Sequence, residues 1–484
     1  MTKEWELIVA GGRVVLPDRV VIADIGIKGG LITAVSDSLD RMLAEEVYDA
    51  SGKFVMPGAI DVHVHLDEPG LGHWEGFKTG SAALAAGGCT TFIDMPLNGI
   101  PPTVTEEALR LKLKAAADSG SYVDYALWGG LVPGNAADLR PLAEAGVAGF
   151  KAFLSAPSDT GEGSFLNVDH RTLVEGMETI AAMDRILALH AESEPIVSRL
   201  AQSKKQAGAV TMRDYLESRP PEAETEAVRY ALELAAKTGC SLHFVHISTP
   251  GAVRLITEAK RSGLDVSLET CPHYLAFTAE DAVRIGSEAK CSPPLRSAEE
   301  REEMWRLIAE DRIDMIASDH SPCPPELKAV PDGNYFGPWG GIAGAQQTLE
   351  LMIGEGWKKR GIPLPQLAKL LSENPARRFG LRGRKGAIEQ GLEADLVIID
   401  TESSYVLSRD LLYYRHPHSL YEGFRFECKV AATLLRGKFV YEADAGPSGP
   451  MTGRWIKPDV SQTGTTRQFS SRSSAALSDR IIQT

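Results

Sequence analysis

The sequence predicts an α/β protein with a (β/α)8 TIM barrel and a small β-sandwich domain formed from both chain ends. Two observations lead to this fold class. Apolar, β-branched segments alternate with helical segments through the middle of the chain, and short alternating strands with glycine turns occupy both ends. The expected boundaries are a barrel over residues 56–379, a discontinuous sandwich over 1–55 and 380–445, and an extension over 446–484.

The two chain ends share one pattern. The first block holds short runs such as ELIVAGGRVVL and VVIADIGIKGG, in which glycine interrupts alternating apolar residues. The pattern returns over residues 383–442, in KGAIEQGLEADLVIID and CKVAATLLRGKFVYE. Neither block alone makes a convincing core, so we expect the two blocks to form one small domain together.

The middle of the chain repeats a strand followed by a helix eight times, which fits a (β/α)8 barrel. An open doubly wound sheet is the structural alternative, but the sequence lacks the glycine-rich phosphate fingerprint of such sheets. The predicted strands cover residues 60–65, 89–95, 123–131, 148–154, 186–192, 241–247, 265–271 and 313–320.

Composition and charge limit the functional classes. The hydrophobic fraction of 43% is ordinary for a globular protein, and the net charge of -14 argues against a nucleic-acid or anionic-membrane surface. Six scattered cysteines form no CxxC pair, which indicates reduced thiols. The N-terminus lacks a signal-peptide pattern, so we expect a cytoplasmic protein. Residues 446–484 are rich in Ser, Gly and Thr, and we expect a partly mobile tail.

Metal-ligating residue types gather at the predicted strand ends. His63 and His65 are two apart on one strand, so their imidazoles face the same way. An HxH pair alone is weak, because ordinary core histidines also occur at this spacing. Barrels of this kind place their chemistry at the carboxyl ends of the strands. Those ends carry four of the eleven histidines, one lysine and one aspartate: His63, His65, Lys151, His190, His246 and Asp319.

Lys151 lies in the apolar strand AGFKAFL. A buried lysine needs an acidic partner or a lowered pKa. The alternative is a lysine carbamylated by carbon dioxide, which becomes an anion able to bridge two metals. Two divalent ions with four neutral imidazoles need such anions, and Asp319 supplies only one. Four other histidines, His73, His170, His416 and His418, fall in predicted loops or helices and are expected at the surface or behind the ligands.

Several segments carry a family resemblance: MPGAIDVHVHLDEPG, HWEGFKTGSAALAAGGCTTFIDMPLN, GFKAFL, LHAE, ETCPHYL, KCSPPLR and IASDHSP. With these the chain resembles the cyclic amidohydrolases of the amidohydrolase superfamily, most closely the allantoinases. The resemblance implies that His63, His65, Lys151 and Asp319 hold one metal, and that carbamylated Lys151, His190 and His246 hold the other. It also implies two divalent ions, with zinc expected and cobalt or manganese possible alternatives, and a homotetramer or homodimer.

The resemblance implies hydrolytic opening of allantoin to allantoate, in ureide catabolism. A hydroxide bridging the metals would attack the ring, with Asp319 as general base and then acid. Dihydroorotases carry an arginine where this chain has Asp67, and hydantoinases carry a tyrosine shortly after the lysine, which this chain lacks. Ser292 matches the substrate-amide contact of the family, although a simple turn hydroxyl is an equal alternative. Gly341 is expected to offer main-chain hydrogen bonds to the ring.

Two other functions stay open at this point. Asp67 also occurs in hydantoinases, so a hydantoinase or dihydropyrimidinase is the alternative enzyme. Metal-free relatives of this fold serve as scaffolds, and such a role is the alternative of another class. The complete ligand set argues against a scaffold, because a scaffold has no use for metal ligands that converge on one face.

Overall fold

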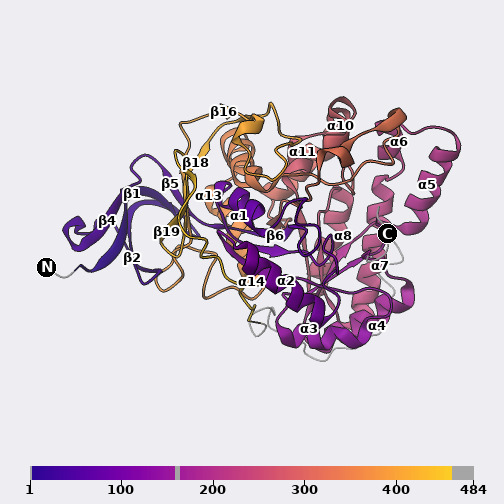
Figure 1. Ribbon diagram of the computed structural model, residues 1–484, viewed down its shortest axis with the longest axis horizontal. Helices are drawn as coiled ribbons and strands as arrows, with labels where there is room; N and C mark the ends of the chain where they lie inside the picture. The colour runs from indigo at the N-terminus through magenta and orange to yellow at the C-terminus, as the bar shows by residue number, and fades with distance from the viewer. Residues whose placement is uncertain (1–2, 158–163, 460–484) are drawn as a thin grey trace.

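A computed structural model describes residues 3–157 and 164–459. Figure 1 shows two parts: a strand-rich end that holds both the first and the last described strands, and a larger part in which helices surround parallel strands. This arrangement confirms the predicted fold class of a (β/α)8 barrel with a sheet domain from both chain ends. The exact boundaries at residues 56 and 379 stay a prediction.

In the described part of the chain, the barrel consists of eight parallel strands, one of them in two pieces. One of them is broken at Trp128, whose indole N–H donates to the Val62 carbonyl at 3.0 Å, so that β8 and β9 are its two halves. A parallel bridge between Val64 and His320 closes the barrel. The strands are β6 (Ala59–Val64), β7 (Cys89–Asp94), β8 (Asp124–Leu127), β9 (Gly129–Gly130), β10 (Phe150–Phe153), β11 (Ile186–His190), β12 (Ser241–Phe244), β13 (Val266–Thr270) and β14 (Met315–Ile316).

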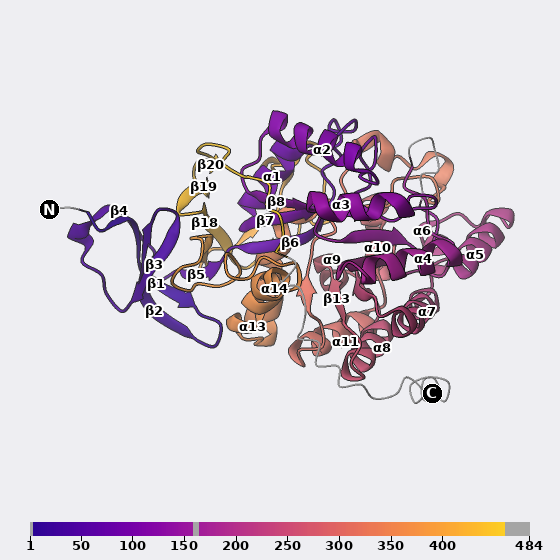
Figure 2. The same ribbon diagram turned by 90° about the horizontal axis from the view of Figure 1, so that it is seen from below.

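Helices cover the outside of the barrel, as seen from below in Figure 2. Their ends follow the sequence: the Thr105 hydroxyl caps α2 by accepting the Ala108 N–H at 3.1 Å, and Gly239 ends α7 with a positive φ of 69°. The helices are α1 (Phe77–Ala86), α2 (Glu106–Ser119), α3 (Leu139–Ala145), α4 (His170–Ala181), α5 (Glu194–Gln206), α6 (Met212–Glu217), α7 (Pro221–Thr238), α8 (Pro250–Arg261), α9 (Pro272–Ala276), α10 (Ala279–Ile285), α11 (Ala298–Ala309), α12 (Thr348–Leu351), α13 (Leu364–Ala368) and α14 (Asn374–Arg378).

Hydrogen bonds join the strands of the two chain ends into one nine-stranded sheet. The junction is the antiparallel pair of β5 and β15, in which Val55 faces Ile398. The strands are β1 (Trp5–Val15), β2 (Val20–Lys28), β3 (Leu31–Ser36), β4 (Ala44–Asp49), β5 (Phe54–Pro57), β15 (Leu396–Asp400), β18 (Lys429–Leu435), β19 (Lys438–Glu442) and β20 (Gly446–Pro447), with a separate ribbon of β16 (Tyr405–Val406) and β17 (Arg425–Phe426).

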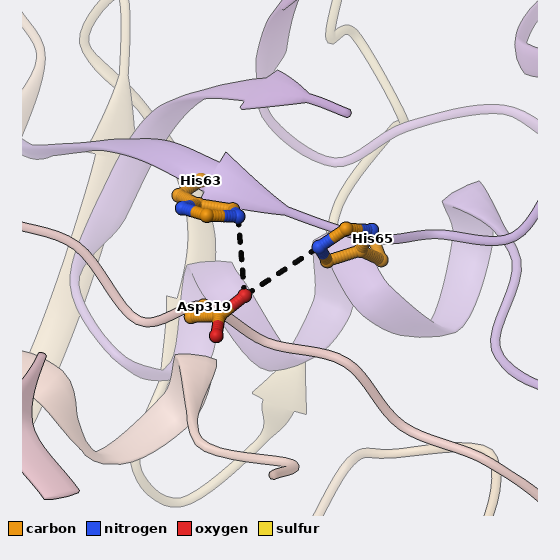
Figure 3. A group of neighbouring side chains, drawn as sticks. All are labelled: His63, His65 and Asp319. Carbon is orange, nitrogen blue, oxygen red and sulfur yellow. Dashed lines mark ion pairs between the residues drawn. The ribbon is translucent and has the colours of Figure 1, made fainter. Parts of the chain in front are cut away.

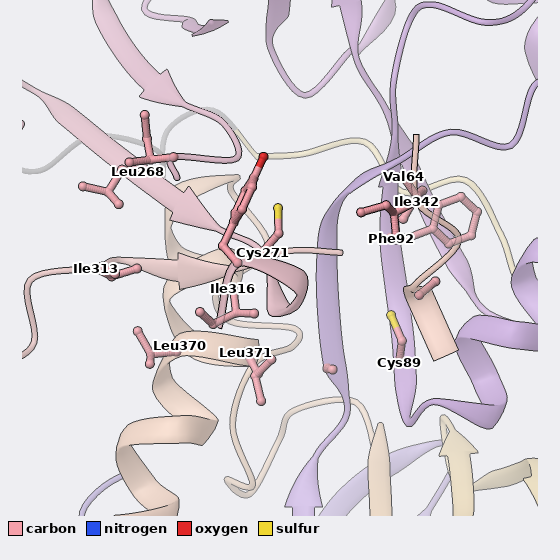
Figure 4. Packing of buried hydrophobic residues seen from close by; sticks show 14 of the residues in the cluster. Val64, Cys89, Phe92, Leu268, Cys271, Ile313, Ile316, Ile342, Leu370 and Leu371 are labelled. Carbon is pink, nitrogen blue, oxygen red and sulfur yellow. The ribbon is translucent and has the colours of Figure 1, made fainter. Parts of the chain in front are cut away.

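The two faces of strand β11 pack in different apolar clusters, and this alternation shows which face carries His190. Leu187 and Leu189 of β11 belong to the large apolar cluster that includes the helices, whereas Ile186 and Ala188 belong to a second cluster. His190 is in register with the second face because side chains alternate along a strand. Figure 4 shows part of the large cluster, with Ile316 beside Leu370 and Leu371.

The first part of the C-terminal extension is held against the barrel. The Ile456 N–H donates to the Tyr125 carbonyl at 2.7 Å, and the Asp459 N–H donates to the Gly380 carbonyl at 2.9 Å. The remainder of the tail expected to be mobile lies outside the described residues. All six cysteines are buried and free. No helix of the described chain is long and apolar enough to cross a membrane.

Candidate metal centre

The six predicted ligands line one cavity at the carboxyl end of the barrel. The cavity has a volume of about 140 Å³ and is lined by His63, His65, Lys151, His190, His246 and Asp319. The strands β6, β10 and β11 place the first four, and His246 and Asp319 follow β12 and β14. His246 and Asp319 both have positive φ angles, 39° and 48°, which are uncommon for residues other than glycine. Backbone strain of this kind clusters at functional sites.

His63, His65 and Asp319 form the first half of the centre. The Nε2 atoms of His63 and His65 lie 3.1 and 3.5 Å from Asp319 Oδ1, as Figure 3 shows. Their ligating atoms all lie within 4.8 Å of one another. Burial alone would raise the pKa of Asp319, but the neighbouring His63, His65 and His246 lower it well below its usual range. The aspartate is therefore anionic.

His190 and His246 form the second half. His190 Nδ1 and His246 Nε2 lie 3.0 Å apart, so two ring nitrogens aim at one point. The other His190 nitrogen, Nε2, lies 2.9 Å from Glu192, which also pairs with Arg219. Burial lowers the pKa of both His190 and His246, which favours the neutral imidazole that binds metals.

Lys151 lies between these halves, with its ammonium 5.1 Å from the centre of the Phe153 ring. Its ammonium is buried, and within the described residues it makes no hydrogen bond or ion pair. Burial lowers its pKa to about 8, although Asp319 and Glu269 oppose the shift. The sequence left open an acidic partner for Lys151, and the described part of the chain shows no such ion pair. An amine with a lowered pKa is a better nucleophile toward carbon dioxide than an ordinary lysine.

This donor set fits two divalent cations. Imidazole nitrogens converge in both halves, an anionic carboxylate joins the first, and a buried amine without a hydrogen bond stands beside both. His63 binds Glu269 through Nδ1 at 2.5 Å, which leaves Nε2 for a metal. A second acidic group, Asp124, Glu393 and Asp395, is different, because the Lys385 ammonium already pairs with all three carboxylates.

The substrate-contact residues divide into two cases. Ser292 lines the cavity, and its hydroxyl is held by the Tyr215 hydroxyl at 2.6 Å. Gly340 also lines the cavity, whereas Gly341 packs behind it, where an added Cβ would lie 2.4 Å from the Ser321 carbonyl oxygen. The roles of Ser292 and Gly341 toward a substrate stay predictions. Asp67 is buried and is not among the lining residues.

The other histidines lie where their sequence context suggests. His73 and His170 are exposed, His416 is partly exposed, and His418 is buried. Sequence reasoning missed Glu192 and Glu269, which contact histidines of the centre, Arg219, which pairs with Glu192, and Tyr215, which contacts Ser292. Glu192 follows His190 by two residues on an extended segment, which is a local signal for it. Nothing in the local sequence singles out the other three.

Comparison with known proteins gives the family. The sequence model of the amidohydrolase family matches residues 54–440. The chain is 49% identical to an allantoinase of Rubrobacter xylanophilus over 94% of this chain and 98% of that protein, and 47% identical to one of Bacillus velezensis at the same coverage. Among solved structures, an L-hydantoinase (dihydropyrimidinase) from Arthrobacter aurescens superposes with a TM-score of 0.90 at 35% identity, over 94% of this chain and all of that one. The chain belongs to the amidohydrolase family.

Proposed function

We propose that this protein is an allantoinase, which opens the hydantoin ring of allantoin by hydrolysis to give allantoate. The observation that carries the proposal is the 45–49% identity to three curated allantoinases over 94% of the chain. The cavity lined by the complete set of six predicted ligands supports a hydrolase rather than a scaffold.

Each of the six candidate ligands has a proposed role in this reaction. His63, His65 and Asp319 would hold one ion, His190 and His246 the other, and Lys151 as its carbamate would contact both. When bound, two divalent ions supply Lewis acidity and an activated water for the attack on the amide. Zinc, cobalt and manganese all accept imidazole and carboxylate ligands, and we propose zinc.

The chain's own residues then handle the proton and the substrate. Asp319 accepts the proton of the attacking water and passes it to the ring nitrogen that leaves. The Ser292 hydroxyl, held by Tyr215, would bind the amide of the ring. Trp74 and Trp339 line the same cavity and contact each other edge to face at 4.9 Å, and this aromatic wall restricts water at the ring.

A substrate panel tests this proposal. Metal-reconstituted protein is assayed with allantoin, hydantoin, dihydrouracil and dihydroorotate. We expect the highest kcat/KM for allantoin and little turnover of dihydroorotate, because Asp67 stands where a carboxylate-binding arginine would be needed. Faster turnover of hydantoin or dihydrouracil would make the hydantoinase alternative the better assignment. That alternative has its own support in the likeness to solved hydantoinases and dihydropyrimidinases.

The quaternary structure and location belong to the same proposal. We expect a homotetramer or homodimer, which sedimentation analysis of the purified protein tests. We also expect a cytoplasmic enzyme, in keeping with six free, buried cysteines.

A further inference from the structure

A buried carboxylate lies directly behind the metal centre. Glu269 is on β13, is fully buried, and is not among the residues that line the cavity. It therefore cannot contact a substrate in this cavity. Its side chain nevertheless contacts residues from both halves of the centre, so its role can be read from those contacts.

One oxygen of Glu269 serves two metal ligands. His63 Nδ1 lies 2.5 Å from Oε1, and the backbone N–H of His246 donates to the same oxygen at 3.2 Å. The first contact fixes the ring of His63 so that Nε2 points toward Asp319, 3.1 Å away. The second holds His246 at the point where its backbone takes the uncommon φ of 39°.

The other oxygen of Glu269 is anchored. His243 Nε2 lies 2.9 Å from Oε2, and His243 Nδ1 lies 2.9 Å from the Ser267 hydroxyl. Because His243 and Ser267 are buried on neighbouring strands β12 and β13, they hold the carboxylate rigidly. The contacts of Glu269 are thus with histidines alone, and within the described residues no lysine or arginine forms a salt bridge with it.

We propose that Glu269 is a positioning residue that aims one histidine ligand in each half of the metal centre and keeps His63 in the tautomer whose Nε2 is free for metal. The proposal concerns the metal centre and does not depend on which cyclic amide the protein opens. A carboxylate behind a ligating imidazole fixes the ring and raises its basicity, and such partners are worth about 10–100-fold in metal affinity.

Glu192 provides the contrast within the same centre. It contacts His190 alone among the ligands, and its charge is balanced by the Arg219 guanidinium. Glu269 instead contacts one ligand in each half, and within the described residues it forms no salt bridge with an arginine. Loss of Glu269 should therefore cost more metal affinity than loss of Glu192.

Zinc retention tests the proposal. Zinc-loaded wild-type protein and the variants Glu269→Gln, Glu269→Ala and Glu192→Gln are incubated with a chelator of known zinc affinity, and the bound zinc is counted by mass spectrometry. Gln keeps the shape and one acceptor oxygen but removes the charge. We expect zinc affinity to fall about 10-fold in Glu269→Gln and about 100-fold in Glu269→Ala, with a smaller loss in Glu192→Gln.

A matched control and a spectrum separate positioning from folding. Glu350→Gln alters another buried carboxylate, which accepts the Val430 N–H at 2.7 Å and pairs with Tyr405 away from the cavity. We expect it to retain zinc like the wild type. With cobalt in place of zinc, the visible absorption bands should shift in Glu269→Gln and stay unchanged in Glu350→Gln. Wild-type zinc affinity together with an unshifted cobalt spectrum in Glu269→Gln would overturn the proposal, even if Glu269→Ala failed to fold.

Discussion

Asp319 is the residue on which the proposed proton transfers depend. Replacement by asparagine keeps an oxygen near His63 and His65 but removes the ability to accept a proton. We expect Asp319→Asn to keep much of its metal while turnover falls by about 10²–10⁴-fold, the usual contribution of general acid–base catalysis. Metal analysis and kcat of the same preparation measure both effects. Near-normal kcat would show that the proton shuttle lies elsewhere.

Lys151 should act as its carbamate. A buried ammonium facing two dications is strongly disfavoured, and a neutral amine has one lone pair and cannot bridge two ions. We expect metal-free protein to regain activity slowly in carbon-dioxide-free buffer and faster with bicarbonate. Lys151→Ala should be inactive and partly rescued by a small carboxylic acid. Prompt, full recovery on metal alone, with unmodified Lys151 by mass, would rule out the carbamate.

The convergence of the six candidate ligands on one cavity could be predicted from the sequence, but the residues that support them could not. His63, His65, Lys151, His190, His246 and Asp319 stand at predicted strand ends, so strand periodicity and barrel architecture suffice to bring them together. Glu269 contacts His63 across 206 residues of sequence. With 65 acidic residues in the chain, only the folded barrel shows which carboxylate lies behind which imidazole.

At the scale of elements, the segment 323–341 carries Trp339 and Gly340 into the cavity wall. Lys328 pins it by donating to the Ser287 and Gly341 carbonyls at 3.1 and 2.5 Å. His418 pins its start: Nε2 lies 2.8 Å from the Cys323 carbonyl and Nδ1 lies 2.8 Å from Glu288. Both partners are acceptors, so the two bonds together require the doubly protonated imidazolium.

The contacts of His418 with Cys323 and Glu288, here called the imidazolium latch, therefore depend on pH. Burial opposes the charge of His418, but Glu288 outweighs it and raises the pKa of His418, while Lys328 acts against the shift. Burial would raise the pKa of Glu288, yet His418, Lys328 and Arg409 lower it. The pair of His418 and Glu288 therefore stabilises the fold fully between pH 4.5 and 6.5, the ordinary pKa values of glutamate and histidine. This stabilisation is lost as pH rises through the raised pKa of His418. It is also lost in acid, as Glu288 is protonated.

We expect His418→Gln to lower the free energy of unfolding by about 1–2 kcal/mol at pH 6, with a smaller loss at pH 9. Thermal unfolding at the two pH values measures the difference. His416→Gln is the control, because His416 is partly exposed and its side chain bonds the His73 carbonyl at 2.9 Å rather than the 323–341 segment. An equal loss for His418→Gln at both pH values would contradict the imidazolium latch.

The strands were the easier elements to predict. Each predicted barrel strand overlaps a strand of the structure, because apolar runs bounded by glycine and proline mark buried strands. The predicted strand 123–131 is instead two pieces, β8 and β9, because Trp128 turns its indole to the Val62 carbonyl between them. The predicted strand 313–320 is a regular strand over Met315–Ile316 alone, and Asp319 with its positive φ lies between that strand and the bridge at His320.

At the scale of the whole molecule, Lys385 ties the barrel to the sheet domain. Its ammonium lies 2.9 Å from Asp124 of β8 and 2.8 Å from Glu393, and it also pairs with Asp395. We expect Lys385→Met to destabilise the protein by about 3–5 kcal/mol, because it removes a buried cation shared by three carboxylates, of which Asp395 has no other salt bridge among the described residues. Lys369→Met breaks only the exposed pair with Asp311 and should cost at most about 1 kcal/mol. Thermal unfolding of the two variants tests this ranking, and equal midpoints would contradict it.

The most direct test of the whole account is allantoin turnover by one preparation before and after metal removal. We predict that the metal-loaded protein converts allantoin to a product heavier by one water, detected by mass spectrometry. The chelated protein should be inactive and should recover when zinc and bicarbonate are added together. Undiminished turnover after complete metal removal would contradict the account, as would a metal-loaded protein that leaves allantoin intact.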